Sequence, residues 1–239
     1  MNRAAFKSRL TFAATNHRPF WGVGVSGSGE LEKALAAKAS WTVASMAGSL
    51  DPKLPASVMG ILPYYQANSD VVRLSDLLRI DNTNIIAGVF AADQFIVISQ
   101  FLDTLRRAGF LAVQNFPSVG IAGEQFRHSL EASGLGYQTE VDLIYQAGEK
   151  GLFTSAVVFT PEQTEAMLSA GADMLVFHPG ITPDGTYASW NQETEARYAK
   201  VARLVPPERS DIVLARLAFA GDDTWRIDGP GIQYDRNML

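Results

Sequence analysis

The sequence predicts an α/β protein built on parallel strands, and its length favours a (β/α)8 barrel. Three observations carry this prediction: short apolar runs recur along the chain, helical patterns separate them, and glycine follows three of the predicted helices. The chain has 239 residues, and roughly 250 residues are typical of such a barrel. A doubly wound sheet is the alternative that the same rhythm leaves open.

Seven apolar runs are predicted to form strands. The runs are continuous rather than alternating in polarity, which is typical of parallel strands covered on both faces. They occupy residues 20–25, 41–45, 84–90, 110–115, 152–159, 173–178 and 211–217.

Helical patterns precede and separate these runs. The apolar opening segment, residues 4–13, is predicted to form a helix that covers the bottom of the barrel. Residues 28–38 place apolar side chains on one helical face, with Ser28 as the predicted cap. Residues 93–109 carry an apolar stripe at helical spacing, and Asp93 is a candidate N-cap.

The clearest helix signal is the peptide TPEQTEAMLSAG, which begins at Thr160. Thr160 is positioned to cap this helix, Pro161 falls at its first position, and Gln163 completes a capping box. Glycine just past a helix favours the left-handed turn that leads into the next strand. Three helices are predicted to end in this way, at Gly109, Gly151 and Gly171.

The divergent carboxyl-terminal tail, residues 218–239, departs from this alternation of strands and helices. A crossover helix and an eighth strand hardly fit in it, because parallel crossovers need about a dozen residues or more. The peptide AGDD at 220–223 is instead predicted to turn a hairpin, which would make TWRI at 224–227 an antiparallel neighbour of the seventh strand. The last βα unit is therefore expected to be modified or incomplete, and the barrel to be left open, closed by the tail or closed by a partner chain. We expect residues 1–239 to form a single domain.

Composition excludes several classes of protein. The formal net charge is -5 and no cluster of five Lys or Arg residues occurs, so nucleic acid is not an expected partner. The absence of cysteine excludes disulfides, thiol nucleophiles and cysteine-bound metals. No apolar run has the length of a signal peptide or of a membrane span, about 18 residues. We therefore expect a cytoplasmic protein with no membrane partner.

Polar residues follow the predicted strands, where active sites gather in parallel α/β folds. Asp93 and His178 are the candidate catalytic residues, because either can transfer a proton. The candidate substrate-binding residues are Ser26, Gly27, Gln114, Asn115 and Arg216. The two carboxamides would hold a carboxylate or enolate oxygen, while Arg216 and the backbone amides near Ser26 would hold an anion.

Each candidate also has a purely structural interpretation. His178 would then be a satisfied core histidine, Asp93 a helix cap, and Arg216 the partner of a carboxylate. Because side chains alternate along a strand, we expect only one of Gln114 and Asn115 to face the barrel interior.

The acidic residues of a later helical pattern, Glu140 and Asp142, are interpreted as a solvated helix face.

Three familiar motifs are not supported. GVGVSG, residues 22–27, matches a dinucleotide fingerprint, but its glycines begin inside a strand and no acidic residue ends the second strand. The three histidines are widely spaced and form no zinc motif. No G-x-S-x-G elbow of a serine hydrolase occurs. The sequence therefore does not identify a cofactor. A divalent cation such as Mg²⁺, bound by Asp93 and water, is the candidate metal, and the sequence indicates no further ligands for it.

Several unusual peptides occur together in one order along the chain. They are GILPYYQAN (60–68), IIAGVFAADQF (85–95), GFLAVQNFPSVG (109–120), FRHSLEASGLGY (126–137) and AGADMLVFHPGITPDGT (170–186). Together they resemble the phosphoenolpyruvate hydrolase-like family of TIM-barrel proteins, over residues 3–190. This family is also similar to the barrel half of a protein related to a plant antiviral resistance factor, so a member need not be a catalyst.

The resemblance implies a TIM barrel that forms a homo-oligomer. It also implies that Asn68, Asp93, Gln114, Asn115 and His178 stand at the family's positions, which adds Asn68 to the substrate-binding candidates. The chain departs from the family at residues 46–49, Met-Ala-Gly-Ser, where the family tends to have N-S-G-R. The D-x-D-x-G-x-G magnesium motif of the phosphonopyruvate-cleaving superfamily does not occur either.

Two functions follow from the residues and the resemblance. The first is an enzyme, a hydrolase or lyase, that cleaves a C–O, P–C or C–C bond of a small oxo-acid such as phosphoenolpyruvate or phosphonopyruvate. The second is a non-catalytic barrel that senses a ligand or binds another protein. An aldolase that works through a Schiff base needs a lysine at a strand end, and none of the predicted strands ends in one.

Overall fold

The computed structural model describes residues 2–16, 18, 20–25, 27–45, 61, 66–78, 84–182, 188–218 and 231–234. Three features singled out in the sequence lie outside these residues: Ser26, the stretch 46–49 after the second strand, and the TWRI peptide at 224–227.

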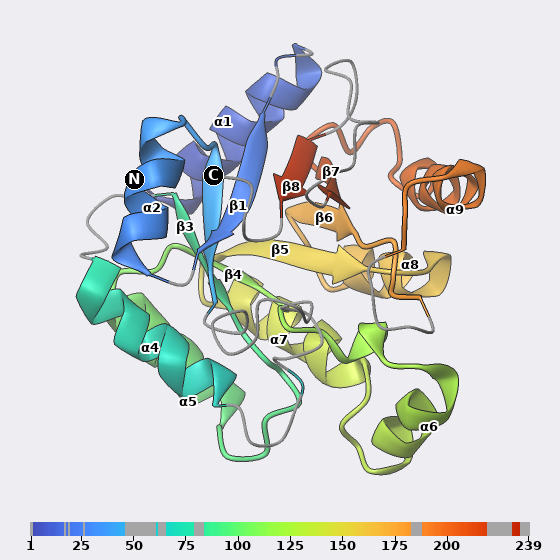
Figure 1. The fold of residues 1–239 in the computed structure, drawn as a ribbon, viewed down its shortest axis with the longest axis horizontal. Helices are drawn as coiled ribbons and strands as arrows, with labels where there is room; N and C mark the ends of the chain where they lie inside the picture. The colour runs from blue at the N-terminus through green and yellow to red at the C-terminus, as the bar shows by residue number, and fades with distance from the viewer. Residues whose placement is uncertain are drawn as a thin grey trace.

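Eight parallel strands form a closed barrel in which each strand pairs with its sequence neighbour and β1 pairs with β8 (Figure 1). The strands are β1 (Trp21–Val25), β2 (Trp41–Ala44), β3 (Ile85–Gly88), β4 (Ala112–Gln114), β5 (Phe153–Val158), β6 (Met174–Phe177), β7 (Val213–Ala218) and β8 (Gly231–Tyr234). Each of the seven predicted runs contains one of the first seven strands or nearly all of it, so the predicted (β/α)8-type barrel is confirmed.

Helices surround the strands (Figure 1). They are α1 (Arg3–Thr15), α2 (Ser28–Ala36), α4 (Ala67–Leu78), α5 (Ile98–Arg107), α6 (Glu124–Ala132), α7 (Gln138–Glu149), α8 (Pro161–Ser169) and α9 (Gln192–Arg203), with a 3-10 turn η2 (Val119–Ile121). The predicted glycine turns are confirmed, because Gly109, Gly151 and Gly171 have φ angles of 95°, 75° and 84°.

The helix caps differ in part from those predicted. Thr160 caps α8, but Gln163 accepts from the backbone N–H of Phe159 rather than from that of Thr160. The helix after β1 is capped by Gly27, with Ser28 as its first residue. Asp93 does not cap α5, whose N-cap is Val97; its carboxylate accepts instead from Asn68 Nδ2 and from the Phe95 N–H.

The eighth strand confirms one of the three alternatives for the carboxyl-terminal tail, in which the tail itself closes the barrel. Residues 231–234 form β8, which runs parallel to β7 and closes the barrel against β1. The antiparallel neighbour predicted for the seventh strand is therefore wrong. The connection at 219–230 lies outside the described residues, and its dozen positions fit the minimum length of a parallel crossover.

The opening helix α1 covers the amino-terminal end of the barrel, as predicted. Its Phe6 and Leu10 are buried among inward-facing strand residues, and the Phe6 ring meets the Phe153 ring edge-on at 4.8 Å. The same interior cluster includes Val43, Ile86, Ala112, Val157, Val176 and Leu217. The barrel is thus filled with apolar side chains from this end upward.

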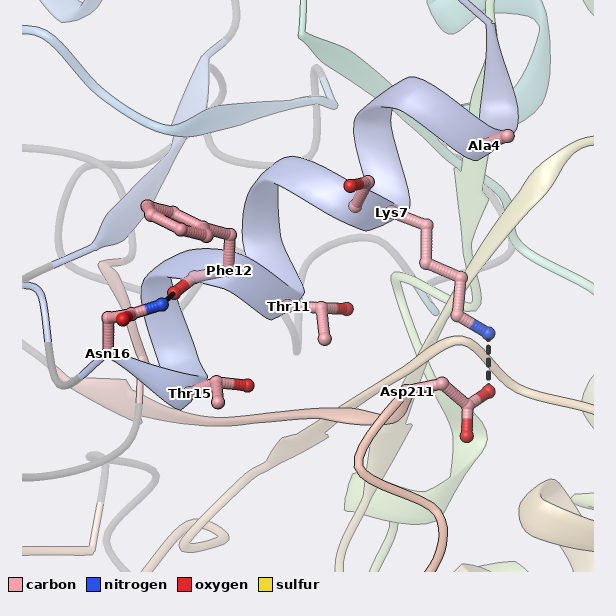
Figure 2. Close-up of a pocket in the computed structure, with 8 residues that line it drawn as sticks. Ala4, Lys7, Thr11, Phe12, Thr15, Asn16 and Asp211 are labelled. Carbon is pink, nitrogen blue, oxygen red and sulfur yellow. Dashed lines mark hydrogen bonds and ion pairs between the residues drawn. The ribbon is translucent and has the colours of Figure 1, made fainter.

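An ionic network fastens α1 to the strand starts. Asp173, just before β6, is 2% exposed and accepts from Arg3 at 3.1 and 3.2 Å and from the Thr154 backbone at 3.0 Å. Lys7 reaches Asp173 at 3.0 Å and Asp211 at 2.7 Å. Figure 2 shows the Lys7–Asp211 pair beside a hollow of about 500 Å³ along α1. This hollow lies at the end of the barrel opposite the carboxyl ends of the strands.

Replacing the buried member of this network is expected to destabilise the barrel. Asp173→Asn should lower the free energy of unfolding by about 3 kcal/mol, because Arg3 loses its countercharge and Lys7 keeps only Asp211. Urea unfolding followed by circular dichroism measures the change. Asp103→Asn is the matched control, since Asp103 pairs with Lys150 at the surface and such pairs contribute little. Equal losses in the two variants would contradict the role of Asp173.

Candidate functional site

Gln114, the last residue of β4, faces the barrel interior. It lies in register with Ser155 on β5, and its Oε1 accepts a hydrogen bond of 3.0 Å from the Ser155 hydroxyl. Its side chain is fully buried, yet Nε2 has no hydrogen-bond partner among the described residues. A buried amide donor without a partner costs about 1–3 kcal/mol, so this atom calls for an explanation.

Asn115, one residue further on, turns to the outside of the barrel. Its Oδ1 accepts from the Val157 backbone N–H at 2.7 Å, and its Nδ2 donates to the Val157 carbonyl at 3.1 Å. The second Nδ2 hydrogen goes to the Glu140 carboxylate on α7. The expectation that only one carboxamide faces inward is confirmed, and the polar atoms of Asn115 are taken up by the protein itself.

The interpretation of Glu140 as part of a solvated helix face is wrong. Its side chain is 1% exposed and accepts from Ser118 Oγ at 2.8 Å and from the Val119 N–H at 2.7 Å, in addition to Asn115. Burial raises the pKa of this carboxyl to about 8, while the three donated hydrogen bonds act in the opposite direction. Asp142, by contrast, is exposed as expected.

A signal for the burial of Glu140 was present in the sequence. Leu143, Ile144 and Ala147 follow it by three, four and seven residues, and all are buried in α7. Glu140 therefore belongs to the apolar stripe of this helix, and an acidic residue on such a stripe indicates a buried partner.

His178 follows β6 and is fully buried against the Phe159 ring, with ring centroids 4.8 Å apart. Its Nδ1 accepts from the Gly180 N–H at 2.9 Å, so the neutral ring carries its proton on Nε2. Burial and, to a smaller extent, the nearby Arg197 guanidinium together lower the pKa of this histidine to about 3. His178 is thus an uncharged ring in the working pH range.

Arg197 on α9 was not identified from the sequence. Its guanidinium donates to the Pro179 carbonyl at 2.8 Å and to the Phe159 carbonyl at 3.2 Å. It therefore ties the loop that follows β6 to the end of β5. Arg197 lies among many charged residues in the sequence of α9, so nothing in the sequence pattern distinguishes it as a loop-binding residue.

Asn68 and Asp93 form a second polar group, after β3. Asn68 is buried at the start of α4, and its Nδ2 donates to Asp93 Oδ2 and to the Phe90 carbonyl, both at 2.9 Å. Asp93 Oδ1 accepts from the Phe95 N–H at 2.9 Å. Both oxygens of the carboxylate are therefore engaged by neighbours that shape the loop.

The other two described candidates lie elsewhere. Arg216 is on the outward face of β7, where its guanidinium carbon stacks 4.2 Å from the centroid of the Trp190 ring. Gly27 begins α2, and a side chain at this position would meet nothing within 4 Å. The structure thus joins Asn68 to Asp93 and Gln114 to Ser155, and places Arg216 away from the barrel interior.

No group of three or more His, Asp or Glu side chains in the described ranges could hold a metal ion. Of the helices in the described part of the chain, none combines the length and apolarity that a bilayer span requires.

The fold is shared with barrels of the PEP mutase/isocitrate lyase superfamily. 2,3-Dimethylmalate lyase, a member, superposes with a TM-score of 0.60 at 16% identity over 96% of this chain and 80% of that one. Phosphoenolpyruvate phosphomutase from Streptomyces platensis subsp. rosaceus gives 0.63 at 15% identity over 97% and 80%. Oxaloacetate acetylhydrolase in complex with the product oxalate gives 0.61 at 13% identity over 98% and 81%.

The chain belongs to the phosphoenolpyruvate hydrolase-like family, whose profile matches residues 8–211. It is 40% identical to ToMV resistance protein Tm-1(GCR237) of Solanum lycopersicum over 132 residues, which are 54% of this chain and 18% of that protein. It is 35% identical to protein y4oT of Sinorhizobium fredii over 118 residues, 48% of this chain and 59% of that protein. The match spans less than a fifth of the tomato protein's length.

The low pKa of His178 predicts a particular response to acid. Because the folded pKa of about 3 lies below the unfolded value of about 6.5, this group's contribution to stability is complete above pH 6.5 and is lost as the pH falls towards 3. His178→Gln should therefore lose stability less steeply between pH 7 and pH 5, by up to about 1.4 kcal/mol per pH unit.

Urea unfolding of both proteins at half-unit pH steps measures this slope. The other titrating groups are common to the two proteins, so the difference between their curves reports on His178. Parallel curves would contradict the buried, uncharged state of this histidine.

Proposed function

We propose that the barrel binds a small oxo-acid at the carboxyl ends of its strands and cleaves a C–O, P–C or C–C bond in it. The observation that carries this proposal is the buried Nε2 of Gln114, which points into the barrel interior without a partner among the described residues. A carboxylate or enolate oxygen of a ligand is the group that would complete this hydrogen bond.

The surroundings of Gln114 support a binding role. Ser155 donates to Oε1, which fixes the plane of the amide and leaves the donor end directed away from β5. His178 lies close to this end of the barrel as a buried neutral ring, because its Nδ1 accepts from the Gly180 N–H. In this proposal Gln114 orients the acid, and its Nε2 donates to an oxygen that gains charge during cleavage.

The similar barrels support the choice of ligand class at the level of fold. Oxaloacetate acetylhydrolase is known with oxalate and with 3,3-difluorooxalacetate bound, and 2,3-dimethylmalate lyase is named for its substrate. Oxalate, oxaloacetate and phosphoenolpyruvate are therefore suitable probes. A homo-oligomer of single-domain chains in the cytoplasm is part of the same proposal.

The second candidate is a barrel that binds such an acid without transforming it. One observation favours it: the Asp93 carboxylate holds the loop after β3 through Asn68 and the Phe95 N–H, which gives this candidate catalytic residue a structural role. In that case Gln114 would bind the ligand as before, and no product would form.

Thermal unfolding with and without each probe tests the binding. A ligand at 100 times its Kd stabilises the folded protein by about 2.7 kcal/mol, so we expect a clear rise in Tm with at least one oxo-acid. Gln114→Leu should bind that acid about tenfold more weakly or worse, through loss of a hydrogen bond to a charged group. The same variant removes the unpaired donor but also the acceptor of the buried Ser155 hydroxyl, so we expect it to lose about 1–3 kcal/mol of stability while still folding.

Gln100→Leu is the matched control, because Gln100 is exposed on α5. It should bind the probe as the wild type does. A Tm unchanged by every oxo-acid would refute the proposal. Incubation of the responding acid with the protein, followed by NMR of the products, separates the enzyme from the non-catalytic barrel.

A further inference from the structure

Glu140 is a buried acid for which the proposed function has no use. It stands on α7, outside the barrel, and does not touch the interior where a ligand would bind. Its three hydrogen bonds all go to the segment that follows β4, at Asn115, Ser118 and Val119. We propose that Glu140 is a positioning residue that, through this segment, fixes the Gln114 carboxamide in its ligand-binding orientation. This inference rests on the proposed function.

The carboxylate suits the task because the loop presents only donors to it. An amide N–H₂, a hydroxyl and a backbone N–H converge on its two oxygens. Both oxygens of the carboxyl group accept, Oε2 from Asn115 and Ser118 and Oε1 from the Val119 N–H, so all three donors are satisfied. Ser118 Oγ in turn accepts from the Gly120 N–H at 3.1 Å, so the hydroxyl hydrogen is committed to Glu140.

Asn115 transmits this anchor to the strands. The ladder between β4 and β5 ends at the pair formed by Gln114 and Ser155. Beyond this pair, the Asn115 side chain takes the place of a β4 backbone group in the ladder. It accepts from the Val157 N–H and donates to the Val157 carbonyl. The Tyr137 hydroxyl, from the residue before α7, donates to the same Val157 carbonyl at 2.6 Å. The exit of β4 is thus tied to β5 and to α7 together.

The backbone carbonyl of Gln114 is held by two hydrogen bonds in this arrangement. Its carbonyl accepts from Val89 N–H and from Phe116 N–H, each at 2.8 Å. The first bond comes from the chain just after β3, and the second comes from the anchored loop itself. A shift of the loop would therefore rotate the backbone that carries the Gln114 amide, and small misplacements of a binding group cost affinity.

Glu140→Gln tests the proposal, with Glu149→Gln as control because Glu149 is exposed at the end of the same helix. The first readout is the side-chain amide resonance of Gln114 in the ligand-free protein, observed by NMR. We expect Glu140→Gln to shift it and Glu149→Gln to leave it unchanged. Ser118→Ala removes one of the three bonds and serves if Glu140→Gln does not fold; it should shift the same resonance by less.

The second readout is a double-mutant cycle on the Kd for oxalate. Glu140→Gln should weaken binding about tenfold in the wild-type background and less than twofold in the Gln114→Leu background, because coupled residues are not additive. Equal losses in both backgrounds, or an unmoved Gln114 resonance, would overturn the positioning role. If no oxo-acid binds the wild type, the proposed function fails. The Gln114 side-chain amide resonance of the ligand-free protein then decides by itself whether Glu140 fixes the orientation of the Gln114 carboxamide.

Discussion

The buried carboxylate of Glu140 organises the end of β4 and, with it, one side of the barrel mouth. β4 has only three residues, so few ladder hydrogen bonds to neighbouring strands hold its end. The three hydrogen bonds of Glu140 hold the chain there instead. A buried polar group is tolerated only when its hydrogen bonds are complete. The loop meets this condition with side-chain and backbone donors. The same bonds fix the register in which Gln114 turns inward and Asn115 turns outward.

The polar groups at the mouth divide into those that hold the protein together and those that face the interior. Asn68, Asp93 and Arg197 bind loop carbonyls and N–H groups, and they hold the segments that follow β3, β5 and β6. Gln114 differs because one end of its amide is satisfied and the other is not. A buried group that costs stability in the free protein is typical of a binding site, where a ligand restores the missing bond.

Much of this architecture could be predicted from the sequence, because continuous apolar runs and post-helical glycines report local constraints. The alternation of side chains along a strand likewise predicts that Gln114 and Asn115 face opposite sides of the barrel wall. The role of Glu140 could not be found by composition, since its partners lie 21 to 25 residues away along the chain. The eighth strand was missed because Gly231–Tyr234 is short and carries no apolar run, and its place depends on pairing with β1 and β7.

The most direct test of the account is a crystal structure of the protein with oxalate bound. The account predicts an oxalate oxygen at hydrogen-bond distance, about 2.7–3.2 Å, from Gln114 Nε2, with the Ser155 and Glu140 contacts unchanged. Oxalate bound away from Gln114, or a protein oxygen paired with Nε2 while the ligand sits elsewhere in the barrel, would contradict it.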